Sequence, residues 1–273
     1  MKIALIQQSA GTDIRKNIDK GIENVYSAAA AGAKIICFPE LAFTPFYPQK
    51  RSDGNNFDLA EEIPGRITNE FSQIAKEKGI VIILNLYERV GDKTFDSTPI
   101  IDSNGKIANV VRMMHITQYE HFYEQDYYFP GDPEIKITGT EFGKIGIAIC
   151  YDRHYPEYMR ALGLAGAEIV FIPQAGAIGE WPEGLYEAEV RTAAFQNGYF
   201  TALCNRVGKE ENLHFAGESF VSDPDGKIIA RAASDKEEIL YSEIDLDLVN
   251  NSYARKLFMR HRRKNIYGKW FEE

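Results

Sequence analysis

The sequence predicts an α/β fold in which helices cover two stacked mixed sheets. Three features of the chain indicate it. Short apolar, strand-like runs alternate with helix-like periodic segments, this alternation occurs on both sides of a central pair of hairpins, and no linker or low-complexity stretch divides the chain. We therefore expect one domain over residues 1–273, with a C-terminal extension from about 247 to 273.

The first half opens with a strand, a helix and a second strand. Residues 2–8 alternate and then run apolar, and apolar side chains recur every three or four residues over 14–29. Gly32 can end that helix, and the apolar run at 34–38 is typical of a strand covered on both faces. Glu40 comes directly after this buried strand.

A helix at 67–78 and a strand at 80–87 follow. A Gly-Asp pair and an Asn-Gly pair are turn signals, so the runs at 94–102 and 106–113 should add antiparallel strands. The stretch 115–138 is rich in aromatic, acidic and proline residues and has no clean period. It is typical of a long ordered loop, and such loops are often functional.

The second half of the chain repeats this alternation of strands and helices. We expect strands at 144–149, 168–172 and 199–204, with helices at 156–164 and 185–197 between them. An Asp-Gly pair then separates two further strands, and the last helix should start near Asp247. The segment 255–269 is basic, which fits a solvated or subunit-packing extension, or an anion-binding one.

Charge and hydropathy exclude several function classes. A net charge of −9 and a pI near 5.2 oppose nonspecific attraction to nucleic acid or anionic membranes. The apolar N-terminal start is too short for a signal peptide, and no apolar run reaches the roughly 20 residues that span a bilayer. We expect a cytoplasmic protein that acts on a small molecule.

Three widely spaced cysteines argue against a disulfide framework and against CxxC metal sites. Cys150 lies where an apolar strand meets polar residues and a helix that Pro156 begins, so we expect an exposed thiol whose thiolate nearby helix dipoles favour. The alternative is an inert buried cysteine. Cys37 and Cys204 lie inside apolar strands and fit a structural role.

Two glutamates are candidates for acid–base chemistry. Glu40 stands between apolar residues after a buried strand, where loss of solvation raises a carboxyl pKa toward the range of a general base. It could instead be a capping or turn carboxylate. Glu124, in the aromatic-rich loop, is a weaker signal by itself.

Taken together, these segments are far more specific. Phe-Pro-Glu-Leu at 38–41, Arg-x-x-His at 112–115, Tyr-x-Pro-Gly-Asp at 128–132 and Ile-Cys-Tyr-Asp-Arg at 149–153 occur in this order. The whole chain resembles the nitrilase superfamily of carbon–nitrogen hydrolases. Within it, the chain looks most like N-carbamoyl-amide hydrolases of the N-carbamoylputrescine amidase and β-ureidopropionase type.

The resemblance implies a four-layer αββα sandwich that pairs into a homodimer or higher homo-oligomer, and a Glu-Lys-Cys triad without metal or organic cofactor. Glu40 falls on the family's general base and Cys150 on its nucleophile. Glu124 falls on a second glutamate beside the triad. The family's lysine corresponds to Met113, whose thioether offers neither a positive charge nor an N–H donor.

The expected reaction is hydrolysis of a non-peptide C–N bond in a small amide or N-carbamoyl amine. Cys150 would form a thioester after Glu40 takes its proton, and Glu40 would then activate water. The Tyr151 backbone N–H is a candidate oxyanion donor. Arg153 and His154 could supply the positive charge missing at position 113, or serve as capping or surface residues.

Four further residues lie in loop or loop-edge segments that would gather near strand ends: Tyr47, Gln174, Trp181 and Glu187. They are candidate substrate contacts, although Trp181 could pack under the following helix and Glu187 could be an exposed first-turn acid. Two alternative functions remain open. One is nitrile hydrolysis by the same thiol, and the other is a catalytically silent member that binds a metabolite or a protein partner.

Overall fold

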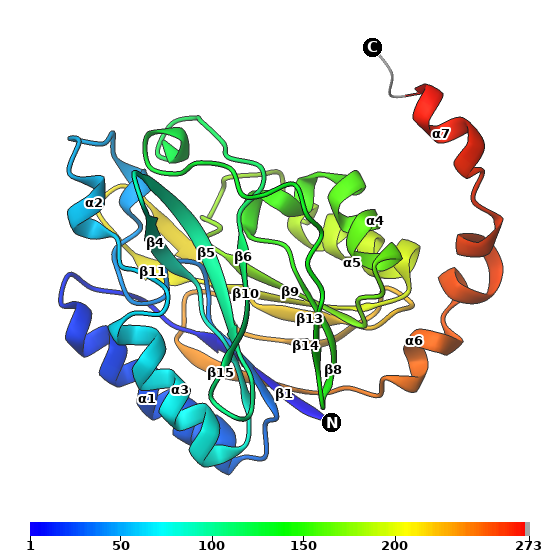
Figure 1. The fold of residues 1–273 in the computed structure, drawn as a ribbon, viewed down its shortest axis with the longest axis horizontal. Helices are drawn as coiled ribbons and strands as arrows, with labels where there is room; N and C mark the ends of the chain where they lie inside the picture. Colours follow the sequence, from blue (N-terminus) through cyan, green and yellow to red (C-terminus); the bar gives the residue numbers. More distant parts are fainter. Residues whose placement is uncertain (271–273) are drawn as a thin grey trace.

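The computed structural model describes residues 1–270. The first sheet contains β1 (Lys2–Gln7), β2 (Ile35–Cys37), β3 (Val81–Ile83), β4 (Leu86–Val90), β5 (Lys93–Ile101), β6 (Ile107–Arg112) and β15 (Glu238–Glu243). Its order is β15-β1-β2-β3-β5-β4, with β6 also paired to β5 (Figure 1). The strands β1, β2 and β3 are parallel and the other pairs are antiparallel, so the sheet is mixed.

The second sheet contains β7 (Thr138–Thr140), β8 (Gly143–Ile147), β9 (Ile169–Gln174), β10 (Phe200–Asn205), β13 (Phe220–Ser222) and β14 (Ile228–Arg231). Its order is β14-β13-β10-β9-β8-β7, again with a parallel centre and antiparallel edges. A separate hairpin joins β11 (Val207–Lys209) to β12 (His214–Ala216).

The four layers arise because the side chains of each strand alternate between the two faces of its sheet. Successive strand residues face opposite sides of a sheet, and Ile3 and Ile35 of the first sheet therefore meet Ile147 and Phe171 of the second in one buried core. The outer face of the first sheet packs under α1 (Ile14–Ala30) and α3 (Arg66–Lys78). That of the second packs under α4 (Pro156–Leu164) and α5 (Leu185–Asn197). The αββα sandwich expected from the sequence is confirmed.

Local signals place the helix ends. Asp13 caps α1 by accepting a hydrogen bond from the Lys16 backbone N–H at 3.1 Å. Gly79 ends α3 with a φ of 61°, a left-handed conformation that glycine adopts at little cost. Pro156 begins α4 in the first turn, where its missing N–H is not needed. The helices expected at 156–164 and 185–197 are confirmed to the residue.

The prediction of a single strand at 80–87 was wrong. The strand expected at 80–87 is two strands, β3 and β4, separated at Leu84 and Asn85. Asn85 is fully buried, and its side chain hydrogen bonds to the Leu41 backbone N–H and to the Asp96 carboxyl group. A buried amide needs such partners, so it leaves the strand to reach them.

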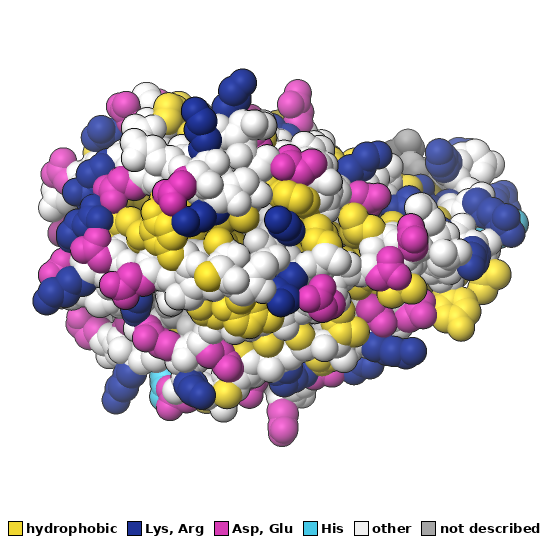
Figure 2. Space-filling model, turned by 90° about the horizontal axis from the view of Figure 1, so that it is seen from below, with side chains coloured by type: hydrophobic (Ala, Val, Ile, Leu, Met, Phe, Trp, Pro, Cys, Tyr) yellow, Lys and Arg dark blue, Asp and Glu magenta, His cyan; other side chains and the backbone are white. Residues whose placement is uncertain are grey.

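The surface carries charges of both signs. Figure 2 shows one face on which basic and acidic side chains lie among apolar ones. The chain ends in α6 (Asp247–Asn251), which begins where the sequence predicted, and α7 (Lys264–Trp270), on a segment that extends away from the sandwich in Figure 1. Among residues 1–270, no helix combines the length and hydropathy that crossing a bilayer requires.

Candidate active site

Two strand ends from different sheets bring the candidate residues together. Glu40 comes three residues after β2 ends, and Cys150 three residues after β8 ends. Because these sheets are stacked, the two side chains meet at the same end of the sandwich. Glu124 joins them from a short 3₁₀ turn in the long loop. The Cys150 sulfur and the nearest carboxylate oxygens of both glutamates lie within 4.8 Å of one another.

A tight turn holds Cys150. Its φ of 43° lies in the left-handed region that non-glycine residues seldom occupy. The buried Asp152 carboxylate braces this turn by accepting hydrogen bonds from the backbone N–H groups of Ile149, at 3.2 Å, and His115, at 3.0 Å, and it contacts the His115 ring at 2.7 Å. Asp152 thus ties the turn that carries Cys150 to the segment after β6.

The thiol is more enclosed than expected. Cys150 is only 4% exposed, so the exposed thiol expected from its strand-end position was wrong. Burial, followed by the nearby charges of Glu40 and Glu124, raises the pKa of Cys150 well above its usual value, which also contradicts the expected thiolate. The free cysteine is therefore a thiol at neutral pH and needs a base to become a nucleophile.

Glu40 has the properties of such a base. Its carboxyl group is fully buried, and burial, reinforced by the charge of Glu124, raises its pKa to about 8. Burial also raises the pKa of Glu124 well above its usual value. The expected rise for a carboxyl group after a buried strand is confirmed for Glu40, whose pKa lies close to the range in which general bases work best.

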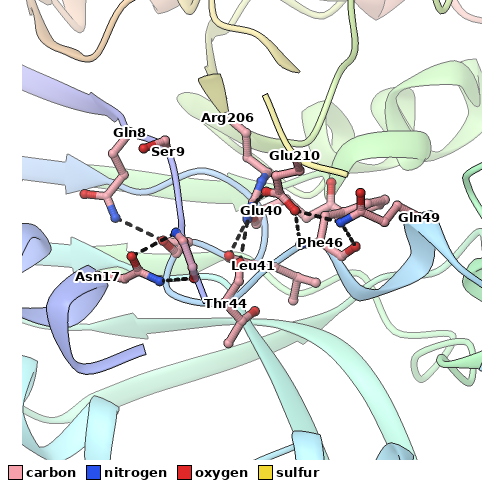
Figure 3. Close-up of polar contacts among 12 residues, drawn as sticks. Gln8, Ser9, Asn17, Glu40, Leu41, Thr44, Phe46, Gln49, Arg206 and Glu210 are labelled. Carbon is pink, nitrogen blue, oxygen red and sulfur yellow. Dashed lines mark hydrogen bonds and ion pairs between the residues drawn. The ribbon is translucent and has the colours of Figure 1, made fainter. Parts of the chain in front are cut away.

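A buried arginine holds the loop that carries Glu40 (Figure 3). Arg206 is 1% exposed, and its guanidinium donates hydrogen bonds to the backbone carbonyls of Glu40, at 3.0 Å, Leu41 and Thr44, at 3.1 Å. It also pairs with Glu210, whose other oxygen accepts from the Phe46 backbone N–H at 2.9 Å. Arg206 comes directly after β10, and its role could not be read from the sequence.

Asp96 is a third buried carboxyl group that the sequence analysis missed. It lies on β5 with no exposed surface, close enough to Glu40 for a hydrogen bond between the two carboxyl groups. Asn85 donates to Asp96 Oδ1 at 2.5 Å. Burial and the charge of Glu40 raise the pKa of Asp96 well above its usual value. The only sequence signal was a polar run, Thr-Phe-Asp-Ser-Thr, inside a strand.

Met113 stands beside these acids. Its backbone N–H donates to the Asp96 carbonyl at 2.9 Å and continues the β5–β6 register beyond the Ser97–Arg112 pair. Directly opposed residues of antiparallel strands project from the same face. The Met113 side chain is fully buried in the same apolar cluster as Cys150. A thioether therefore lies on the face from which Asp96 reaches Glu40.

Arg153 and Gln174 support the backbone of Cys150. The buried Arg153 guanidinium donates to the Cys150 carbonyl at 2.9 Å and to the Gln174 side-chain oxygen at 3.1 Å. His154 points elsewhere, because its Nδ1 lies 2.8 Å from the Glu189 carboxylate and its ring contacts Trp181. Of the two cationic candidates, Arg153 is the one whose charge bears on the thiol.

The remaining candidates lie around the site rather than within it. Tyr47 packs on Tyr87, and Tyr151 packs between the rings of His154 and Tyr155. Trp181 follows Glu180, a carboxylate that binds the hydroxyl groups of Tyr119 and Tyr186 and bears electrostatically on Cys150. No sequence pattern distinguished Glu180 from an ordinary loop acid.

Glu187 lies apart from this group. It pairs with Arg191 and Arg231 on the surface of α5, which favours the helix-surface alternative for this residue.

The spacing of Glu40, Glu124 and Cys150 would also allow a metal ion to bind. Hard cations prefer all-oxygen ligands, whereas zinc accepts mixed sulfur and oxygen sets. A protonated thiol and carboxyl groups of raised pKa bind metal poorly, since ligands must lose their protons first. The cluster therefore suits proton transfer and nucleophilic attack better than metal binding.

A buried thiol beside a carboxyl base, at the strand ends of an αββα sandwich, defines a cysteine hydrolase of the nitrilase type. A sequence model described as "Carbon-nitrogen hydrolase" matches residues 2–253, and the chain belongs to this family.

Several relatives agree. The chain is 32% identical to N-carbamoylputrescine amidase from Arabidopsis thaliana over 97% of this chain and 93% of that one, and 32% identical to beta-ureidopropionase from the same plant over 98% and 72%. A crystal structure of a carbon-nitrogen hydrolase from Helicobacter pylori G27 superposes with a TM-score of 0.93, at 30% identity and covering 100% and 99% of the two chains.

Proposed function

We propose that this carbon–nitrogen hydrolase cleaves a small amide or N-carbamoyl amine, with Cys150 as nucleophile and Glu40 as general base. The observation that carries the proposal is the approach of the Cys150 sulfur to the Glu40 and Glu124 carboxylates within 4.8 Å. The names of the relatives at about 32% identity support this substrate class.

The proposed reaction has two halves. Glu40 accepts the Cys150 proton while the sulfur attacks the carbonyl carbon, and the proton then passes to the leaving nitrogen, so that an amine or ammonia departs and a thioester remains. Water replaces the amine, Glu40 takes its proton, and hydrolysis returns the thiol. Glu124 orients the substrate, and the Tyr151 backbone N–H donates to the oxyanion.

Residues around this centre would shape the substrate pocket. We propose that Tyr47, Tyr151, Gln174 and Trp181 line it and that Arg153 and His154 bound it. We propose that Arg153 partly replaces the lysine that is missing at position 113. Its guanidinium binds the Cys150 carbonyl and places a positive charge near the thiol.

The test is intact-protein mass spectrometry after mixing with amides, N-carbamoyl amines and nitriles. We expect a substrate-derived adduct that Cys150→Ser abolishes, and a turnover rate that rises with pH through about 8 as Glu40 ionises. An adduct from nitriles alone would make the protein a nitrile hydrolase. No adduct and no product from any of the three classes would make it a silent binding protein.

We further propose that the chain is a single domain that acts in the cytoplasm as a homodimer or larger homo-oligomer. Three free cysteines suit a reducing compartment. Large apolar side chains near the C-terminus, Tyr253, Leu257 and Trp270, are more than half exposed, and such patches often mark subunit contacts. Light scattering during gel filtration gives the oligomeric state, and a monomer at micromolar concentration would refute this part.

A further inference from the structure

The Cys150 site holds several buried acids and little positive charge to balance them. Glu40, Asp96 and Glu124 each have no exposed surface. The guanidinium groups that bear on Glu40 and Cys150 belong to Arg206 and Arg153, and each already binds backbone carbonyls and a carboxylate. Position 113, beside Asp96, carries a thioether instead of a cation.

Hydrogen-bond acceptors in this site also lack donors. Apart from the Cys150 thiol and the contact between the Glu40 and Asp96 carboxyl groups, no donor among the residues described reaches either oxygen of Glu40, one oxygen of Asp96 or one of Glu124. The Tyr128 hydroxyl, on a residue 5% exposed, is likewise unpartnered, and its electrostatic environment is set by the same three acids. A buried acceptor without a donor destabilises the site, because its lost hydration is not replaced. Two unpartnered donors, Arg153 Nη2 and Gln174 Nε2, also belong to side chains beside Cys150, and the oxygens of Glu40, Asp96 and Glu124 are left to accept N–H groups from a ligand.

The charge of the substrate group that Cys150 attacks determines whether the buried acids favour or oppose thiolate addition. Thiolate addition to a neutral amide places negative charge on oxygen, which nearby carboxylates oppose and which no lysine at position 113 relieves. Addition to an amidinium or guanidinium instead removes a positive charge and leaves a neutral tetrahedral adduct. Such planar cations carry several N–H donors in a fixed plane, the pattern that carboxylates bind well. Their positive charge also lowers the pKa of carboxyl groups beside them, which opposes the effect of burial on these acids.

We propose that the Cys150 site hydrolyses the C–N bond of a small amidinium or guanidinium compound, whose N–H groups bind the unpartnered oxygens of Glu40, Asp96 and Glu124. The inference rests on the proposed roles of Cys150 and Glu40 and extends them to a cationic electrophile.

Each step balances. Glu40 takes the Cys150 proton, the sulfur–carbon bond forms, and the C=N electron pair moves onto nitrogen. The proton on Glu40 then passes to the leaving nitrogen, the C–N bond breaks, ammonia or an amine departs, and a cationic thioimidate remains on the sulfur. Water attacks that carbon and Glu40 takes its proton. The carbon–sulfur bond then breaks, Glu40 returns that proton to the sulfur, and the proton left on the product oxygen passes to the ammonia or amine. The products are an amide or a urea and an ammonium ion, and no oxidant or further reactant is needed.

The experiment compares isosteric pairs that differ in charge: acetamidinium with acetamide, and guanidinium with urea. Ammonia release and intact mass are measured at pH 8 for the parent, Asp96→Asn and Met113→Lys. We expect kcat/KM for each cation to exceed that for its neutral isostere by at least about tenfold in the parent. Asp96→Asn retains an acceptor for Asn85 but removes the ionisable group, and should lower the ratio of kcat/KM for each cation to that for its neutral isostere by about tenfold or more. Met113→Lys should reverse the preference.

Three results would overturn the inference. Turnover of acetamide, urea or N-carbamoyl amines without turnover of either cation would refute it and leave the proposed function standing. Absence of product and of any Cys150 adduct with all these compounds would refute both this inference and the proposed function. Protection of Cys150 from iodoacetamide by Zn²⁺ or Ca²⁺, with no effect of acetamidinium or guanidinium, would mean that the acids form a metal site instead.

Discussion

Removing the Arg206 guanidinium should damage both the stability of the protein and the placement of Glu40. In the parent the side chain is 1% exposed, donates to three backbone carbonyls of the 40–44 segment, and pairs with Glu210. Arg206→Met preserves apolar bulk but leaves those carbonyls without donors and the Glu210 carboxylate without its cation.

The size of the effect follows from burial. Breaking a buried ion pair by removing one partner typically costs about 3–5 kcal/mol, because the remaining charge stays desolvated. We expect Arg206→Met to lower the free energy of unfolding by about that amount in urea titrations. Arg206→Met combined with Glu210→Gln should recover part of the loss, because the double variant no longer buries an unpaired carboxylate. Arg15→Met is the matched control, since Arg15 forms its ion pairs at an exposed site, and should change little.

If Arg206 had a purely structural role, its removal would not change the reactivity of Cys150 in the folded protein. Arg206 binds the Glu40 carbonyl, so its loss should displace Glu40 from Cys150 and change the pH profile of iodoacetamide alkylation under conditions where the variant is still folded. Arg206→Lys keeps the charge but cannot reach all these acceptors at once, and should lie between parent and Arg206→Met. An unfolding free energy within about 1 kcal/mol of the parent, with an unchanged alkylation profile, would refute the reasoning.

Three further predictions concern the thiol and its neighbours. Glu40→Gln should reduce turnover at least about 10²-fold. Because the folded pKa of about 8 lies above the unfolded value near 4.5, ionisation of Glu40 costs the parent stability as pH rises from about 5 to 8, so this variant should gain stability relative to the parent over that range in thermal melts. In native protein, iodoacetamide should label Cys150 before Cys37 and Cys204, which lie inside strands, and peptide mapping that favours either of those two would contradict the assignment. Met113→Lys should raise turnover of a carbamoyl amide and lower the pH at which Cys150 is alkylated, and an unchanged rate and profile would mean that position 113 does not influence the thiol.

Much of the fold followed from local patterns. The strands β1, β2, β9 and β10 and the helices α1, α3, α4 and α5 appear where apolar periodicity and glycine or proline signals predicted them. These signals are local, because a strand or helix shows its buried face in the spacing of its own residues. The pairing of β15 with β1 was not predicted, since it joins residues more than 230 positions apart.

The sequence by itself determined the sandwich, the family and the pairing of Glu40 with Cys150, because both residues follow apolar strands and lie in recognisable motifs. Only the tertiary structure decided that Cys150 is buried, that Asp96 lies beside Glu40, and that Arg206 binds the loop that carries Glu40. The physical reason is that solvent exposure and charge neighbours depend on how the two sheets stack and on what the long loop brings to their strand ends. A polar residue in a strand, or an arginine just after one, has the same sequence pattern whether it faces water or a buried site.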